Sequence, residues 1–307
     1  MILVLVPAVV VTAAALAGFV GGWWWAFDLL SNFRPQYAVA GTLLGLVLVI
    51  GRWRKTGAVV AGVGVLNAAL VGFLWIPPPG SQTPATEAFT VMTFNVRAAN
   101  EARGAVFDYI GRTRPDVVFL HETTVLWEEA AEAADLGYEI YTVGQPGLIF
   151  STMVLAPVGT QFEGFGFATA EPRAVEARFD SPAGPVAVLG IHPLSPITAE
   201  RAALRNAQME WAAEWAAGQQ VPAVVAGDLN ATQWSHAWRD FVSTSGLRDS
   251  TRGFGLQPSF PMDGNPLVRV QIDHLLHSAD LVTLDRRLGP RLGSDHAPVI
   301  VVLAAAG

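Results

Sequence analysis

The chain has 307 residues, of which 51% are hydrophobic and only 15% are charged, and it contains no cysteine. Such a composition excludes a disulfide-bonded scaffold and is apolar for a soluble protein. Fifteen of the 19 basic residues and 25 of the 26 acidic ones follow Pro77, which gives that part a net charge of about −10. This part therefore has no excess of basic residues that would neutralise nucleic-acid phosphates.

The apolar excess lies in the first 76 residues, in the three stretches Ile2–Phe27, Tyr37–Ile50 and Gly57–Ile76. A membrane-spanning helix needs about 20 residues. The first and third stretches are long enough, and the second becomes so if it includes Phe33–Gln36. We expect three transmembrane helices within residues 1–76. A cleaved signal peptide is the alternative for the first stretch, but that stretch has no basic start and two more apolar stretches follow it.

The basic residues between these stretches predict how the helices are oriented. The link between the second and third stretches carries Arg52, Arg54 and Lys55, whereas the link between the first and second carries only Arg34. Short loops rich in Lys and Arg stay in the cytoplasm. We therefore expect a multi-pass cell-membrane protein whose residues after Pro77 lie outside the cytoplasm.

A Pro-rich linker over residues 77–87 separates the membrane domain from a second domain over residues 88–307. Runs of strand type and runs of helical periodicity alternate through this second domain. The predicted strands are Phe89–Phe94, Asp116–His121, Tyr138–Val143, Leu148–Ala156, Ala174–Phe179, Val186–Ile191, Ala223–Ala226, Val268–Leu276 and Pro298–Leu303. The predicted helices are Glu101–Arg112, Val125–Leu136, Thr198–Ala217 and Ser235–Ser245. Thr198 is the expected N-cap of the third helix, although Arg201 at the third position leaves no capping box.

Polar side chains recur at or near the ends of the apolar strand-like runs. Several strands can aim such side chains into one cleft. The groups are Thr93-Phe94-Asn95, His121-Glu122, Gly227-Asp228-Leu229-Asn230, Ile272-Asp273-His274 and Gly293-Ser294-Asp295-His296. A set of carboxylates, amides and histidines suits a divalent cation and a phosphate better than a packed core.

These groups, in this order, resemble the endonuclease/exonuclease/phosphatase superfamily of Mg²⁺-dependent phosphoesterases. The resemblance covers roughly residues 88–303. It implies an α/β fold, the four-layer αββα sandwich of two packed mixed sheets flanked by helices. The pattern of elements alone does not choose this fold over other α/β folds.

Mg²⁺ takes oxygen ligands and typically one or two carboxylates, and Mn²⁺ is a possible substitute. Glu122, at the end of a strand, is the best candidate ligand, although an exposed Glu that begins the next helix is the alternative. The resemblance implies that Asn95 and Asp295 complete or neighbour the metal shell. Asn95 is otherwise a simple turn residue.

Asp228 and Asn230 are two positions apart, so on extended backbone they point the same way. Asp228 is then expected to hold or deprotonate the attacking water, and Asn230 to donate to a phosphate oxygen. The alternative is that Gly-Asp-Leu-Asn is only a turn.

His296 paired with Asp273 forms a carboxylate–imidazole pair that favours a cationic ring and stabilises charge on a phosphoryl oxygen. His192 matches the family's strand-end histidine and is expected to contact phosphate. Arg173 offers bidentate geometry to phosphate, with a surface arginine as the equal alternative. The histidines at 121, 236, 274 and 277 are interpreted as surface or internally satisfied residues.

Two departures from the family pattern weaken an assignment to DNA repair. Arg97 stands where the nucleases often have an acidic residue, and His121 replaces a frequent glutamine. The layout of three N-terminal helices and an external catalytic domain is similar to that of actinobacterial membrane phosphatases associated with teicoplanin resistance. That resemblance implies a role in the cell wall, with undecaprenyl pyrophosphate as substrate.

The expected partners are therefore a phosphorylated lipid and the bilayer, with nucleic acid disfavoured and no protein partner inferred. The first alternative is an extracytoplasmic phosphodiesterase or nuclease of the same superfamily. A catalytically inactive membrane scaffold on this fold is the weaker alternative, because a scaffold has no need to keep the whole polar set.

Overall fold

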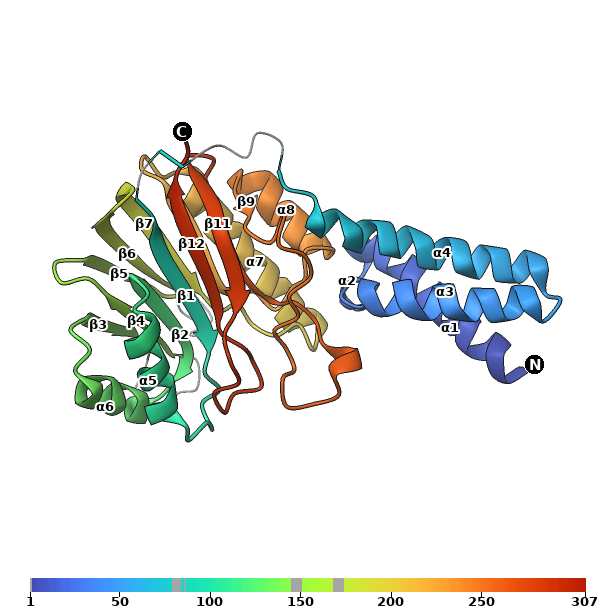
Figure 1. Cartoon of the computed structure of the whole chain (residues 1–307), viewed down its shortest axis with the longest axis horizontal. Coiled ribbons are helices and arrows are strands. Elements are labelled where there is room, and N and C mark those ends of the chain that lie inside the picture. The colour runs from blue at the N-terminus through green and yellow to red at the C-terminus, as the bar shows by residue number, and fades with distance from the viewer. Residues whose placement is uncertain (1, 79–83, 86, 145–150, 168–173) are drawn as a thin grey trace.

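The computed structural model describes residues 2–78, 84–85, 87–144, 151–167 and 174–307. Figure 1 shows a sandwich of two sheets with a helical bundle projecting from one side. The bundle and the sandwich meet at the side of the sandwich that carries the helices α7 (Ala199–Ala217) and α8 (His236–Ser245).

Each sheet of the sandwich has six strands, and each contains one parallel pair among antiparallel ones. In spatial order, the first sheet consists of β11 (Leu281–Leu288), β12 (Val299–Ala305), β1 (Phe89–Asn95), β2 (Val117–Thr123), β4 (Ser151–Ala156) and β3 (Glu139–Val143). The second consists of β5 (Gln161–Phe165), β6 (Ala174–Ser181), β7 (Gly184–Ile191), β8 (Ala223–Asp228), β10 (Asp273–His277) and β9 (Arg248–Asp249).

Helices cover the outer face of each sheet. Helices α5 (Arg103–Thr113) and α6 (Val125–Ala134) pack on the first sheet, and α7 (Ala199–Ala217) and α8 (His236–Ser245) pack on the second. A third apolar layer, which includes Phe89, Phe119 and Val188, fills the space between the sheets. Three apolar layers between four layers of elements make this the expected αββα sandwich.

The helix start predicted at Thr198 is confirmed. Thr198 Oγ1 accepts a hydrogen bond from the backbone N–H of Arg201 at 3.2 Å. Ser235 caps α8 in the same way, by accepting from the N–H of Trp238. Each cap satisfies one N–H group that the first turn of a helix leaves without an intrahelical partner.

The strand predicted over Val268–Leu276 is wrong in its first half. A one-turn 3₁₀-helix, η3, occupies Pro266–Val268 after Asn265, whose side chain accepts from the N–H of Leu267. Val270 then pairs with Phe260 in an isolated bridge, and β10 begins only at Asp273. The apolar–polar alternation here serves a local turn-back of the chain and not the sheet.

Three short or edge strands, β5, β9 and β11, were not among the predicted strands. Strand β11 lies at the edge of the first sheet and contains Asp285, Arg286 and Arg287. Charged side chains are common on edge strands, and they hide the apolar run by which a central strand is recognised. The first three residues of the predicted strand Leu148–Ala156 lie outside the described residues.

The projecting bundle is built from α1 (Ile2–Ala17), η1 (Gly18–Trp23), α2 (Trp25–Ser31), α3 (Arg34–Ile50), α4 (Arg54–Gly72) and η2 (Phe73–Trp75). Two helical segments, Leu3–Trp23 and Arg54–Trp75, are long and apolar enough to cross a membrane. A third span results only if α2 and α3, which are bent by 70° to each other, count as one. The sequence prediction of three spans is therefore refined to two or three, because α3 alone has 17 residues and is bent away from α2.

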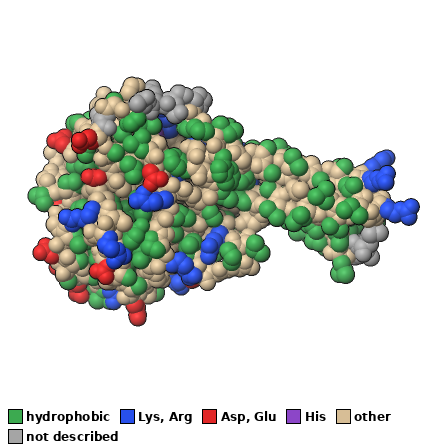
Figure 2. All heavy atoms as spheres, viewed as in Figure 1, with side chains coloured by type: hydrophobic (Ala, Val, Ile, Leu, Met, Phe, Trp, Pro, Cys, Tyr) green, Lys and Arg blue, Asp and Glu red, His purple; other side chains and the backbone are tan. Residues whose placement is uncertain are grey.

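Small residues bring α3 and α4 close together. A Cβ atom on Gly45 would lie 2.4 Å from the backbone nitrogen of Ala61, and one on Gly41 would lie 3.0 Å from Gly64 Cα. Small residues at such contacts are typical of helices that pack inside a membrane. Figure 2 shows hydrophobic side chains along the bundle and Lys and Arg side chains at its far tip, where Arg52, Arg54 and Lys55 are exposed.

Candidate active site

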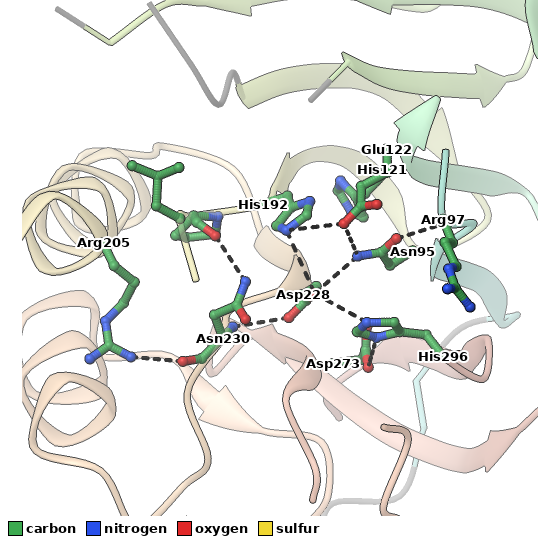
Figure 3. A network of polar contacts seen from close by, with 12 residues as sticks. Asn95, Arg97, His121, Glu122, His192, Arg205, Asp228, Asn230, Asp273 and His296 are labelled. Carbon is green, nitrogen blue, oxygen red and sulfur yellow. Dashed lines mark hydrogen bonds and ion pairs between the residues drawn. The ribbon is translucent and has the colours of Figure 1, made fainter. Parts of the chain in front are cut away.

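The pairing of the strands brings the polar motifs to one end of the sandwich. Strands β1 and β2 are parallel, so Asn95 and Glu122 end side by side. Asp273 pairs directly with Asp228 across β10 and β8. His296 precedes β12, which is antiparallel to β1 and so begins where β1 ends. Figure 3 shows these side chains pointing toward one another.

Asn95 joins two carboxylates that come from opposite sheets. Its Nδ2 donates to Glu122 Oε1 at 2.9 Å and to Asp228 Oδ2 at 3.1 Å. Its Oδ1 accepts from the backbone N–H of Arg97. Asn95 and Asp228 are buried, and Glu122 is partly exposed. The trio thus forms the floor of a polar site between the two sheets.

Two of the site residues have left-handed backbone, which is uncommon for residues other than glycine. Glu122 has φ = 60° at a bulge in the pairing of β2 with β4, and Asn230 has φ = 49°. Backbone of this kind costs of order 1–3 kcal/mol and clusters at functional sites. The bulge turns Glu122 out of the regular alternation of β2, toward Asn95.

His296 and Asp273 form the predicted pair. His296 Nδ1 lies 2.9 Å from Asp273 Oδ2, which also accepts from Ser259 Oγ. Burial opposes the charged imidazole, but Asp273 and Asp228 outweigh it and raise the pKa of His296 to about 10. His296 Nε2 then faces Asp228 Oδ2 at 3.7 Å. The ring is a cation that faces into the site.

Asp228 is the centre of this arrangement. Its Oδ2 faces His192 Nε2 at 3.6 Å as well as His296, while its Oδ1 accepts from the N–H of Asn230. Complete burial raises the pKa of Asp228, and the two histidines lower it. A buried carboxylate between imidazoles is suited to accept a proton from a bound water.

The prediction that Asp228 and Asn230 lie on extended backbone is wrong. Asn230 is left-handed, and its N–H closes a turn onto the Asp228 carboxylate. The Asn230 side chain donates from Nδ2 to the carbonyl of Pro193 at 3.0 Å. Asn230 therefore ties the chain segment that follows His192 to the segment that follows Asp228.

The donor set fits a divalent cation. Glu122 and Asp228 present oxygens around one amide, and no Arg or Lys of the described residues lies within ion-pair distance of either carboxylate. Asp228, Asp273 and His296 also bring ligand atoms within 4.8 Å of one another. That second group is the poorer cation site, because His296 Nδ1 and Asp273 Oδ2 are already bonded to each other. The partly exposed Glu122 carboxylate is the favoured ligand, whereas Asn95 turns its amide nitrogen toward the carboxylates and accepts from the N–H of Arg97 with its oxygen.

Two predicted site residues are not joined to this cluster. Asp295 accepts from Ser294 Oγ at 3.4 Å and helps to raise the pKa of His296, but no contact within the described part of the chain joins it to Glu122. Arg173 lies outside the described residues.

The four histidines interpreted as surface or internally satisfied residues are either hydrogen-bonded in the interior or paired at the surface. His121 is buried between the hydroxyls of Thr93 and Thr152. His274 and His277 are buried, and a hydrogen bond joins each to a backbone carbonyl. His236 is exposed enough to pair with Asp240 at the surface.

Two contributors were not predicted from sequence. Ser259 donates to Asp273, and Arg205 donates from Nη1 to the carbonyl of Asn230 at 2.8 Å (Figure 3). Neither belongs to a strand-end motif. Arg205 lies in the middle of a long helix, where an arginine is usually a surface residue. No local signal marks either residue.

An αββα sandwich with carboxylates, an Asn and an Asp–His pair at its strand ends has the architecture of a phosphoesterase. The sequence model of the Endonuclease/Exonuclease/phosphatase family matches residues 92–296 of this chain. Since this is more than half of the chain, the protein belongs to that family. Members of the family hydrolyse phosphoesters with divalent metals.

Solved structures agree in fold. An endonuclease/exonuclease/phosphatase from Beutenbergia cavernae DSM 12333 aligns with a TM-score of 0.58 and 19% identity over 72% of each chain. A humanized D. rerio TDP2 aligns with a TM-score of 0.60 and 15% identity, over 71% of this chain and 99% of the other. The mannosyl-6-phosphatase Bt3783 of Bacteroides thetaiotaomicron aligns with a TM-score of 0.54 and 20% identity, over 70% and 99%. Among curated proteins, none matches the chain.

Proposed function

We propose that this protein is a membrane-anchored, Mg²⁺-dependent phosphoesterase with an extracytoplasmic active site, and that it hydrolyses a lipid pyrophosphate such as undecaprenyl pyrophosphate. One observation carries the catalytic part of this proposal. Asp228 lies between a cationic His296, His192 and the Asn95–Glu122 pair, in a single buried cluster.

In the proposed reaction, a water molecule attacks the terminal phosphorus and gives its proton to Asp228. The bridging P–O bond breaks, and the electron pair leaves on the lipid monophosphate. His296 stabilises negative charge on the phosphoryl oxygens, held in place by Asp273. Glu122 would hold a divalent ion, with Asn95 and Asp295 completing or neighbouring its shell, and such an ion would neutralise the charge of the two phosphates.

His192 and Asn230 are the proposed contacts to phosphate. His192 Nε2 lies 4.0 Å from Glu122 Oε1 and 3.6 Å from Asp228 Oδ2, so it is close to both carboxylates. An amide nitrogen carries two N–H donors, so Asn230 can hold Pro193 and still donate to a phosphate oxygen. Arg173 is proposed as a further phosphate ligand on its residue type alone.

The lipid substrate is supported by the bundle and by charge. Exposed apolar side chains such as Leu43, Ile50 and Val59 cover α3 and α4, as expected of helices that face lipid. The remainder of the chain has a net charge of about −10, which disfavours a long polyanion such as DNA. A terminal phosphate requires no strand-binding groove.

A substrate panel tests the reaction. The detergent-solubilised full chain with Mg²⁺ is given the lipid pyrophosphate, a phosphodiester lipid and abasic duplex DNA. We expect inorganic phosphate and lipid monophosphate to form fastest, and the Asp228→Asn variant to control for contaminating phosphatases. Faster turnover of DNA would replace this proposal with the nuclease alternative, and inactivity toward all three would favour the scaffold.

Cysteine labelling tests the orientation, since the chain has no cysteine of its own. Glu87 is exposed just before β1, and Thr56 is at the start of α4 beside the basic turn. In intact cells a membrane-impermeant thiol reagent should label Glu87→Cys and spare Thr56→Cys. The reverse pattern would place the active site in the cytoplasm.

A further inference from the structure

A buried polar contact joins the bundle to the catalytic domain. Helix α2 and the residue after it bring Asp28 and Asn32 to one helix face, four positions apart. Asp28 is only 5% exposed, although it lies among the apolar helices of the bundle. An ionisable residue in such a place needs a partner and is a candidate for a functional role.

The partners of Asp28 both belong to the catalytic domain. Arg205 of α7 donates from Nη2 to Asp28 Oδ2 at 3.2 Å. The backbone N–H of His236, at the first turn of α8, donates to Asp28 Oδ1 at 2.5 Å. A carboxylate at this position also interacts favourably with the positive end of the helix dipole.

Arg205 connects Asp28 to the active site. The same guanidinium donates from Nη1 to the carbonyl of Asn230 at 2.8 Å, as Figure 3 shows. Asn230 in turn donates its N–H to Asp228 and its amide to Pro193. Only Arg205 and Asn230 therefore stand between the carboxylate of α2 and Asp228.

Asn32 holds the middle of the same segment. Its Oδ1 accepts from the N–H of Thr232 at 3.3 Å and from the Thr232 hydroxyl at 2.8 Å. The segment from Asn230 to His236, which we name the catalytic loop, is thus bound directly by the bundle at Thr232 and His236, and at Asn230 only through Arg205.

The backbone of η1 is shaped for this contact. A Cβ on Gly22 would lie 2.5 Å from the ring of His236, and a Cβ on Gly21 would lie 2.8 Å from Asp28 Oδ1. Glycine at both positions lets η1 approach α2 and α8 closely. Segment η1 therefore packs closely against α2 and against His236, the last residue of the catalytic loop.

We propose that Asp28 and Asn32 are positioning residues that fix the catalytic loop from within the membrane domain, so that turnover depends on an intact contact between bundle and sandwich. The activity part of this proposal rests on the proposed function. The alternative is that the same contacts only hold the two parts together, without influence on Asn230 and Asp228.

Matched variants of the full chain in detergent distinguish the positioning role of Asp28 and Asn32 from a purely structural role. Asp28→Asn removes the charge and keeps the shape, and Asn32→Ala removes the second contact. Asn67→Ala is the control, because Asn67 is also a buried polar residue of the bundle but accepts from Arg34, and no hydrogen bond among the described residues joins it to the catalytic loop. Asp28→Glu keeps the charge and should restore part of any loss.

Two readouts are measured on each variant, amide hydrogen exchange of residues 229–238 and steady-state hydrolysis. We expect Asp28→Asn and Asn32→Ala to speed exchange in the catalytic loop and to lower kcat roughly tenfold to a hundredfold, with little change in KM. A misplacement of about 1 Å at a catalytic group can cost this much in rate. Asn67→Ala should lower the melting temperature but leave loop exchange and kcat near wild type.

Wild-type loop exchange in Asp28→Asn, or equal effects from Asn67→Ala, would overturn the proposal. A change in exchange with unchanged kcat would also overturn it, since the contact would then be purely structural. If the wild type hydrolyses no phosphoester, the proposed function fails, whereas the exchange data still decide whether the bundle fixes the loop.

Discussion

Strand β10 carries a buried ionisable group at each end, and the two ends behave in opposite ways. At its first residue, Asp273 bonds to His296 and, with Asp228, raises the pKa of that histidine to about 10. At its last residue, His277 donates from Nδ1 to the carbonyl of Ser278 and accepts from Thr283 Oγ1. Burial lowers the pKa of His277 to about 4.

The two histidines are almost equally buried, so burial alone does not decide their charge. Carboxylates surround His296, whereas His277 has hydrogen-bond partners that are neutral and lies opposite Arg248, whose positive charge also lowers the pKa of His277. The comparison shows that the partners determine whether a buried imidazole is a cation or a neutral hydrogen-bonding group. In this chain the carboxylates of Glu122, Asp228 and Asp273 gather at one end of the sandwich, and that end is the candidate active site.

Removing either charged group at the site end should have the largest effect. We expect His296→Ala and Asp228→Asn each to lower kcat by about 10²–10⁴-fold, because each removes a group assigned to charge stabilisation or proton transfer. Single-turnover hydrolysis measures the effect. His277→Gln, at the other end of β10, is the control and should retain wild-type kcat. Near wild-type rates in both site variants would refute the mechanism.

The metal contact should give the next largest effect. Glu122→Gln keeps the hydrogen bond to Asn95 within reach but removes one negative charge from the proposed ligand set. We expect the Mg²⁺ concentration for half-maximal activity to rise at least about tenfold, in line with the effect of losing a metal contact. An unchanged metal titration would exclude Glu122 as a ligand.

His277 should make stability depend on pH in the acidic range. Its folded pKa is about 4 and its unfolded value about 6.5, so the unfolded state binds the extra proton between these values. The contribution is fully present above about pH 6.5 and is lost as pH falls toward 4, on the order of 3 kcal/mol in total.

Chemical denaturation at several pH values measures this effect. The slope of unfolding free energy against pH between 6.5 and 4 should be smaller in His277→Gln than in wild type. Identical slopes would show that His277 is protonated equally in the folded and unfolded states.

The smallest expected effect concerns the N-cap of α7. Thr198→Ala removes the hydrogen bond from Thr198 Oγ1 to the N–H of Arg201. We expect a loss of about 1 kcal/mol in the free energy of unfolding, with kcat unchanged. A drop in kcat would show that the start of α7 also positions the site through Arg205.

Sequence reasoning identifies those parts of the protein that local pattern encodes. Alternation and apolar runs locate the central strands, and Gly-Asp-Leu-Asn and Ser-Asp-His at strand ends indicate the site because strands carry their terminal residues to a common edge. The same reasoning fails at β11, where the edge position favours charges. It also fails at Val268–Ile272, where alternation accompanies a local turn instead of a strand.

Tertiary structure alone decides how the polar groups are paired. Asp28 and Arg205 are 177 positions apart, and each has an unremarkable local context, a single acid among apolar residues and an arginine in a helix. The turn at Asn230 and the Ser259–Asp273 contact likewise require segments that meet only in the folded chain. Local propensity acts over a few residues, whereas a buried charge is stabilised by whichever partner the packing of distant elements brings to it.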